Sequence, residues 1–270
     1  MKLTSYVWGA ITLLSGIALL ASGPVYAQRA SRVEAALEEA GDHRAHLRVP
    51  AAEAAYQRAF GISPDDPQVL VAYASFNRNL GEYAEAIRLL RRAAELSADD
   101  QFMLYQLGIA YRYAKDYDAA ARVHQRYIGL NPTAASGRLQ LAYTEIVRGN
   151  RGEALRHLQV AEQMYGDDAD NWRTAQLAFN YAQLGRRQDV MRLFDRLGEM
   201  ETVSQAAWAM AYIALGDYEQ ALQRLETAVS DPEAIGGAAN ILYQLAANPF
   251  GDPALGGPQF QEVFGPIWGT

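Results

Sequence analysis

The chain has 270 residues, of which 50% are apolar and 20% are charged, and it contains no cysteine. Its 24 Lys and Arg stand against 31 Asp and Glu, and this net charge of −7 disfavours nucleic-acid binding, because an acidic surface repels phosphate groups. The lack of cysteine excludes disulfides and an amino-terminal lipoprotein anchor. Alternating polar and apolar runs typical of strands are not found, so we expect an all-α fold.

Residues 1–27 have the pattern of a signal peptide. Lys2 supplies a positive start and residues 7–21 an apolar stretch, which Gly23-Pro24 should end by breaking the helix. Small residues then mark a cleavage site after Ala27. The alternative is an uncleaved inner-membrane anchor formed by residues 7–21, but this stretch falls below the ~20 residues that span a bilayer comfortably. We therefore expect export to a bacterial periplasm and no stable membrane span after cleavage.

A short turn motif recurs five times along the chain. It is centred on Gly81, Lys115, Gly149, Gly185 and Gly216, at spacings of 34, 34, 36 and 31 residues. Glycine at four of the five centres fits a helix end that needs a left-handed residue, where a side chain costs roughly 1 kcal/mol. Five positions further on the chain has Ala86, Ala120, Ala154, Val190 and Ala221. Small residues there would let paired helices approach closely, so the period predicts an array of helical hairpins.

These residues resemble the tetratricopeptide repeat family, here in an exported bacterial member. The family pattern is met best by Leu104, Leu107, Gly108, Tyr111, Tyr117, Ala120 and Pro132. His124 departs from the pattern, because the family has a large apolar residue at that position, and we interpret it as a core residue. The resemblance covers about residues 30–232. It implies a right-handed superhelix, or α-solenoid, of five to six helical hairpins with a C-terminal capping segment.

The predicted organisation has four parts. Residues 1–27 are the signal peptide, and residues 28–66 are a divergent first repeat whose two helices are joined by a long loop at 41–46. Residues 67–232 form the regular repeat array. Residues 233–270 contain a capping helix and a tail, which should cover the apolar face left open at the end of the array.

The sequence contains no nucleophile elbow, phosphate-binding loop or zinc-protease motif. His43 and His46 lie beside Asp42, but two histidines without a third ligand are typical of a solvated segment. We therefore expect no enzyme activity, no metal and no cofactor. An enzyme would need an active site of carboxylates and tyrosines that matches no motif.

In the family that the chain resembles, partners bind on the concave face, where the first helices place five positions of each unit in a groove. We expect a protein or peptide partner there, because aromatic and arginine residues carry much of the binding energy at interfaces. The expected contacts are Arg78, Asn79, Tyr105, Arg112, Tyr113, Tyr143, Trp172 and Phe179, and Phe102 has a groove position as well. For Trp172 and Phe179 the alternative is packing between units, since a register error of one residue exchanges the two faces.

The resemblance and the leader together predict a non-catalytic periplasmic scaffold or adaptor. Envelope proteins of this family serve in pilus assembly, secretion and polysaccharide export, and the sequence does not select among these. The family's clamp for carboxyl-terminal peptides needs Lys and Asn where this chain has Val71 and Ser75, so that specificity is not supported. The alternative is a structural component of an envelope complex that associates with itself, and the oligomeric state is left open.

Overall fold

The structure is a computed structural model that describes the backbone of residues 7–97 and 100–231, and the side chains of residues 26–97, 100–167 and 169–231. These residues form twelve α-helices, one short 3-10 helix and no strand, so the all-α prediction is confirmed for them. The helices are α1 (Val7–Ala45), α2 (Val49–Ile62), α3 (Pro67–Asn79), α4 (Tyr83–Leu96), α5 (Gln101–Tyr113), α6 (Tyr117–Leu130), α7 (Ala135–Val147), α8 (Arg151–Tyr165), η1 (Gly166–Asp168), α9 (Asn171–Gln183), α10 (Arg187–Glu199), α11 (Gln205–Leu215) and α12 (Tyr218–Ser230).

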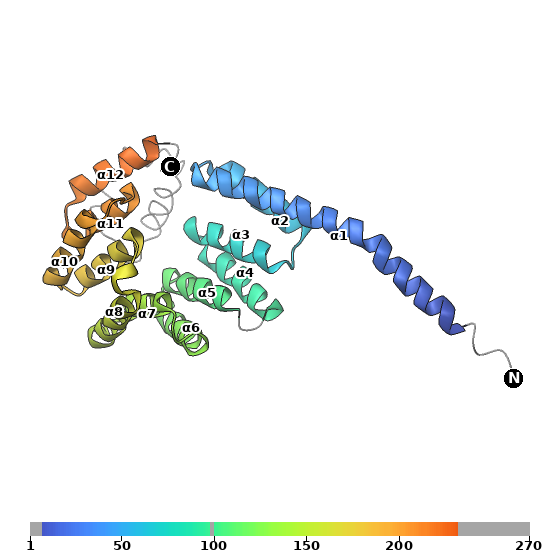
Figure 1. Ribbon diagram of the computed structural model, residues 1–270, viewed down its shortest axis with the longest axis horizontal. Coiled ribbons are helices and arrows are strands. Elements are labelled where there is room, and N and C mark those ends of the chain that lie inside the picture. Colours follow the sequence, from blue (N-terminus) through green and yellow to red (C-terminus); the bar gives the residue numbers. More distant parts are fainter. Residues whose placement is uncertain (1–6, 98–99, 232–270) are drawn as a thin grey trace.

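Consecutive helices pair as six hairpins, from α1 with α2 to α11 with α12. Figure 1 shows the hairpins stacked in chain order around an arc, with α3, α5, α7, α9 and α11 on its inner side. We call these five helices the inner layer. Each of them contacts the next one in the series, α3 with α5, α5 with α7, α7 with α9 and α9 with α11. The predicted α-solenoid is therefore confirmed, and the cap predicted for residues 233–270 lies outside the described residues.

The turns within the hairpins confirm the reason for the recurring glycines. Gly81, Gly149, Gly185 and Gly216 all have positive φ, and Lys115 has a φ of 63° at the equivalent position. In the first of these turns the Glu82 amide donates to the Asn77 carbonyl at 2.9 Å, and in the second the Asp116 amide donates to the Tyr111 carbonyl at 2.9 Å. These bonds satisfy carbonyls that the helix end would leave without partners. They also hold Lys115 in the left-handed conformation, which is unfavourable for a residue with a side chain.

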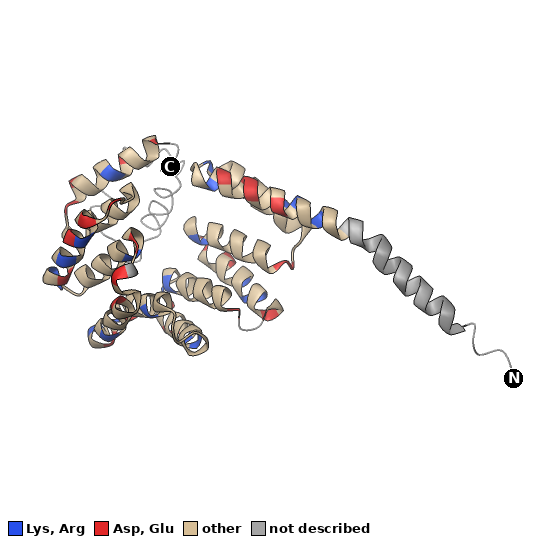
Figure 2. Ribbon diagram, viewed as in Figure 1, with Lys and Arg blue, Asp and Glu red and all other residues tan. Residues whose placement is uncertain are grey.

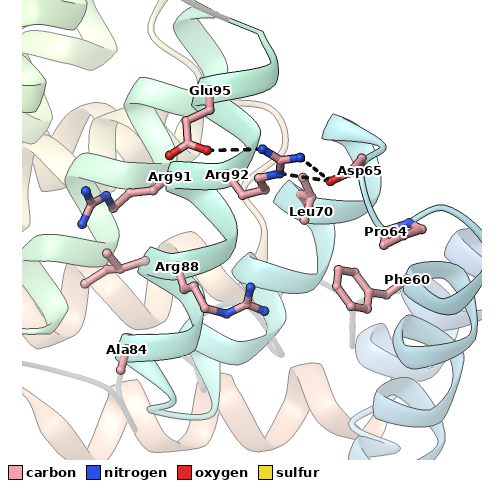
Figure 3. A pocket seen from close by; sticks show the side chains of 10 residues that line it. Phe60, Pro64, Asp65, Leu70, Ala84, Arg88, Arg91, Arg92 and Glu95 are labelled. Carbon is pink, nitrogen blue, oxygen red and sulfur yellow. Dashed lines mark hydrogen bonds and ion pairs between the residues drawn. The ribbon is translucent and has the colours of Figure 1, made fainter.

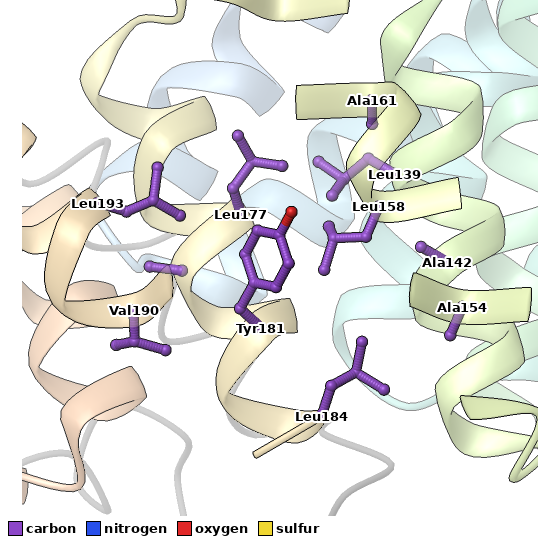
Figure 4. Close-up of a cluster of buried hydrophobic side chains, with 11 residues drawn as sticks. Leu139, Ala142, Ala154, Leu158, Ala161, Leu177, Tyr181, Leu184, Val190 and Leu193 are labelled. Atoms are coloured by element: carbon purple, nitrogen blue, oxygen red, sulfur yellow. The ribbon is translucent and has the colours of Figure 1, made fainter. Parts of the chain in front are cut away.

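The small residues after each turn lie where the helices of a hairpin meet. Ala86, Ala120 and Ala154 are fully buried, and Val190 has the same position in the fourth regular hairpin with 2% exposure. The core also continues across the boundaries between hairpins, as Figure 4 shows for Leu139 of α7, Leu158 of α8, Tyr181 of α9 and Leu193 of α10. Each hairpin therefore covers the apolar face of its neighbour.

The amino-terminal hairpin differs from the prediction in two places. Helix α1 continues through Gly23 and Pro24, so the predicted break is wrong. Proline in a helix removes one hydrogen bond but need not end it where Ala- and Leu-rich segments on both sides favour helix. The predicted loop at 41–46 is also wrong, because α1 extends to Ala45 and turns at Leu47, which has a φ of 57°.

Local contacts explain why α1 continues so far. The Asp42 carboxylate accepts a hydrogen bond from Arg48 at 2.6 Å and lies 3.1 Å from the His46 ring, which ties the turn back onto the helix. Leu47 packs against the core cluster of α9 to α12, so the first hairpin also meets the last ones. Within the part of the chain whose side chains are described, no helix has the length and apolar character needed to cross a membrane.

Gly108 offers a test of how closely α5 and α6 pack. A Cβ atom at Gly108 would lie 2.4 Å from the His124 ring, whereas one at Gly129 would have no atom within 4 Å. Gly108→Ala should therefore lower the free energy of unfolding by about 1–3 kcal/mol, the usual cost of overpacking. Gly129→Ala should leave it unchanged or raise it by about 0.5–1 kcal/mol, because alanine favours helix.

Urea denaturation followed by circular dichroism measures both variants. The crowding of the His124 ring predicts that His124→Ala reduces the cost of Gly108→Ala in a double-mutant cycle. Equal effects of the two glycine substitutions would contradict the close packing.

Candidate partner-binding surface

Arginine and glutamine side chains join the inner-layer helices in a ladder. Arg78 of α3 donates to the Oε1 of Gln106 of α5 at 2.6 Å, and Arg112 of α5 donates to the Oε1 of Gln140 of α7 at 2.7 Å. The two arginines are 34 residues apart, as are the two glutamines, so one bond repeats with the period of the array. Gln140 also donates to the Tyr105 hydroxyl at 3.2 Å. The predicted contacts from α3 and α5 are thus brought together through two glutamines.

Aromatic rings extend this ladder along the inner layer. The Arg112 guanidinium carbon lies 4.0 Å from the centre of the Tyr143 ring, a distance at which cation–π attraction is effective. Tyr143 of α7 lies in turn beside Phe179 of α9, with 6.1 Å between ring centres. Tyr113 is flanked by Arg78 at 5.9 Å and Arg112 at 5.5 Å. A continuous row of contacts therefore runs from α3 to α9.

Accessibility divides the predicted contact residues into two groups. Arg112 and Tyr113 are buried, with 3% and 8% exposure, so their main contacts are within the protein. Arg78, Asn79 and Tyr105 are half-buried and can still be touched by a partner. Arg78, Asn79 and Tyr105 are thus the better candidates for direct contact with a partner.

Two of the predicted residues take part in packing between hairpins. Trp172 and Phe179 of α9 pack against the cluster that includes Ala206 and Met210 of α11. This is the alternative that we considered for them, and it follows from the side-by-side arrangement of α9 and α11. Partner contact by these two residues stays a prediction.

Phe102 is the most accessible large apolar side chain of the inner layer, with 58% exposure. It lies three residues before Tyr105 and seven before Ile109 on α5, a spacing that places all three on one helix face. Its groove position was visible in the sequence, but only the structure distinguishes it from its buried neighbours. The glutamines Gln106 and Gln140 were missed, and their spacing of 34 residues was the available signal.

Several charged residues elsewhere form ion pairs. Figure 2 shows both signs of charge along α4 and α10. A cavity of about 510 Å³ opens between α2 and α4, bordered by apolar residues and by arginines of α4 (Figure 3). Arg88 pairs there with Glu85 at 2.6 Å, and Arg92 pairs with Asp65 at 3.0 Å.

Among the described side chains, no three His, Asp or Glu residues gather as metal ligands would.

Family models described as tetratricopeptide repeat match this chain over residues 67–110 and over residues 103–136. The chain carries tetratricopeptide repeats. The matched residues include α3, α5 and α6, and therefore much of the inner-layer row described above. The wider tetratricopeptide resemblance, over residues 30–232, rests on the period of the turns and on the stacked hairpins.

Solved structures share this fold. A tetratricopeptide repeat protein from Parabacteroides merdae is 19% identical, with a TM-score of 0.57 over 77% of this chain and 83% of that one. PilF from Pseudomonas aeruginosa is 12% identical, with a TM-score of 0.52 over 74% of this chain and 91% of that one. MamA is 18% identical over 63% of this chain and 92% of that one, with a TM-score of 0.46. No curated protein matches in sequence. At these identities the likeness to the first two structures shows the fold alone.

His124 departs from the tetratricopeptide pattern in a way that the structure explains. Its side chain is fully buried on α6, as expected of a core residue, and its ring packs against the backbone of Gly108. Among the described residues no group forms a hydrogen bond with either ring nitrogen. Burial, together with the nearby Arg112 charge, lowers the pKa of His124 to about 3. The neutral ring therefore takes the place of an apolar side chain.

This depressed pKa predicts a pH dependence of stability. The unfolded chain binds a proton at His124 near pH 6.5 and the folded chain only near pH 3, so stability is lost as the pH falls through this window. Between pH 7 and pH 5 the loss from this group should be about 2 kcal/mol. His124→Leu should remove that part of the dependence in urea denaturation at both pH values.

Gln125→Leu is the matched control, because Gln125 is the exposed and uncharged neighbour of His124 on α6. It should retain the wild-type difference between pH 7 and pH 5. If the His124→Leu variant shows the same difference as wild type, His124 is not a buried neutral ring.

Proposed function

We propose that this protein is a non-catalytic scaffold that binds a segment of a partner protein along its inner layer. The observation that supports this proposal most directly is the side-by-side arrangement of α3, α5, α7 and α9, which brings arginine and aromatic side chains from four hairpins into one row. Such side chains supply much of the binding energy at protein interfaces. The tetratricopeptide repeat is in general an interaction fold without catalysis.

The partner contacts in this proposal are the accessible members of the row. Phe102 near the start of α5 offers exposed apolar surface, and the half-buried Tyr105, Arg78 and Asn79 offer polar contacts further along the inner layer. The buried Arg112 and Tyr113 lie behind them, and the half-buried Tyr143 packs on Arg112, so these three hold neighbouring helices in place. An extended segment or a helix of the partner could span several hairpins on such a surface, and an interface of standard size buries about 800 Å² on each side.

The cellular place that we propose is the periplasm, within envelope machinery such as pilus assembly, secretion or polysaccharide export. This part of the proposal rests on the leader pattern at residues 1–27, with its apolar stretch and small-residue cleavage site. The absence of cysteine is compatible with an oxidising compartment. Purely cytoplasmic scaffolds have no need of such a leader.

Partner capture tests the inner layer. Full-length protein, the double variant Phe102→Ala/Asn79→Ala and the control Met191→Ala would each be used to capture proteins from an envelope extract, with crosslinks mapped onto the chain. Met191 is the matched control, because it is an exposed apolar residue of α10, one of the outer helices α4, α6, α8, α10 and α12 that lie on the outer side of the arc (Figure 1). Wild type and control should recover the same partner, and the double variant should lose it by roughly tenfold or more, as expected for removal of central contacts.

Circular dichroism provides the check on folding, since both substituted side chains are accessible and their removal should leave the helices intact. Undiminished capture by the double variant would reject the inner layer as the binding surface.

Export predicts a processed amino terminus. Intact mass measurement of the protein from a periplasmic fraction should give a chain that begins at Gln28, because the cleavage site follows Ala27. Ala27→Leu should block processing and leave the protein in the membrane fraction, while Ala30→Leu, beyond the site, should be processed normally. An unprocessed wild-type chain in the cytoplasm would overturn the periplasmic assignment.

A further inference from the structure

Two neighbouring cations of the inner layer, Arg78 and Arg112, have no anionic partner among the described side chains. Among the residues whose side chains are described, no Asp or Glu forms an ion pair with Arg78 or Arg112, and their hydrogen bonds go to amide oxygens of Gln106, Asn79 and Gln140. Other arginines, among them Arg88, Arg92, Arg148 and Arg192, do pair with carboxylates. A charge that is removed from water without a partner is costly.

Both arginines also have unused hydrogen-bonding capacity. A guanidinium carries five N–H donors, and the described bonds use two at Arg78 and one at Arg112. The Nε of each is buried without any hydrogen-bond partner in the described part of the chain. Arg112 is 3% exposed, and Arg78, the accessible one, lies half-buried at the carboxyl end of α3. The two guanidinium carbons lie 5.9 Å and 5.5 Å from the same Tyr113 ring, so they form one local concentration of positive charge.

The surrounding groups do not neutralise this charge. Burial raises the pKa of Tyr105 and of Tyr143, so both hydroxyls stay uncharged near neutral pH. Burial is the main cause that lowers the pKa of Arg78, while the nearby Tyr113 raises it and the charge of Arg112 lowers it. Glu145 of α7 is a buried carboxylate, but it accepts hydrogen bonds from Arg148 at 2.7 Å and from Asn150 at 2.6 Å. Its charge is thus committed to the turn after α7.

We propose that the Arg78 and Arg112 pair is a binding site for a carboxylate of the partner, supplied by an Asp or Glu within an acidic segment. Arg78 makes the direct contact, through N–H groups that its two amide partners leave unused. Arg112 is positioned behind it by Gln140 and Tyr143 and contributes charge rather than contact. The uncharged tyrosines and glutamines around the pair keep it positive until the partner binds. This inference rests on the proposed inner-layer function and assigns the chemistry of the partner.

The site differs from a clamp for a terminal carboxylate. Such a clamp uses lysine and asparagine in the groove, whereas Val71 at the corresponding position of α3 is apolar and buried. The arginines lie near the carboxyl ends of their helices, one on α3 and one on α5. A carboxylate within a segment can reach them from along the inner layer, so the partner need not end there.

A selection with random peptides tests this site. Peptides displayed on phage would be selected on the full-length protein, and those that Phe102→Ala weakens would be taken as inner-layer binders. These peptides should be enriched in Asp and Glu. Replacement of the acidic residue by Asn or Gln should weaken binding by roughly tenfold or more, since a partly buried charge pair is lost. Higher salt should weaken the wild-type complex as well.

Arg78→Gln should weaken the binding of the same peptides to a similar degree. This variant should bind the acidic peptides and their Asn or Gln replacements with equal affinity. Arg78→Lys retains the charge without the planar fork and should bind better than the glutamine variant and less well than wild type. Arg122→Gln is the matched control, because Arg122 is an exposed arginine of the outer helix α6, and it should bind as wild type does. Thermal unfolding establishes that each variant is folded.

The outcomes separate the two proposals. Inner-layer binders without acidic enrichment, or with equal affinity for wild type and Arg78→Gln, would overturn the carboxylate site and leave the scaffold function standing. Binders that no inner-layer substitution weakens would count against the scaffold proposal itself.

Discussion

The structure depends on the burial of one hairpin's apolar face by the next hairpin. A pair of short helices cannot enclose a core by itself, and here clusters of buried residues extend across hairpin boundaries, as with Leu139 of α7 and Leu177 of α9. Burial of a leucine side chain contributes roughly 1.5–3 kcal/mol, so a few such contacts at a boundary strongly favour the stacked order. The small residues at Ala86, Ala120 and Ala154 allow the close approach on which this burial relies.

The same constraint determines what the inner layer can do. Because the hairpins stack in register, positions 34 residues apart lie on neighbouring helices, and one favourable bond can be repeated along the array. Arg78 to Gln106 and Arg112 to Gln140 are such a repeated bond. It holds the inner helices together while leaving the arginines positively charged. A side chain can thus be structural and still determine the chemistry of the surface in front of it.

Much of the fold could be predicted from the sequence, because the turn glycines and the small residues report the geometry of the hairpin directly. The first hairpin was less predictable, since the extension of α1 to Ala45 depends on the contacts of Asp42 with Arg48 and His46. The candidate site was predictable as a set of positions but not as a set of roles. That Arg112 is buried and Phe102 exposed depends on how neighbouring helices face each other, and a one-residue change of register exchanges those faces.

The central claim is that a partner lies on the inner layer and not on the outer helices. Side-chain footprinting of the full-length protein, alone and with its captured partner bound, tests this claim most directly. The account predicts that labelling of Phe102 and Tyr105 on α5 falls when the partner binds, while labelling of Met191 on α10 is unchanged. Loss of labelling at Met191 with Phe102 and Tyr105 unaffected would contradict it.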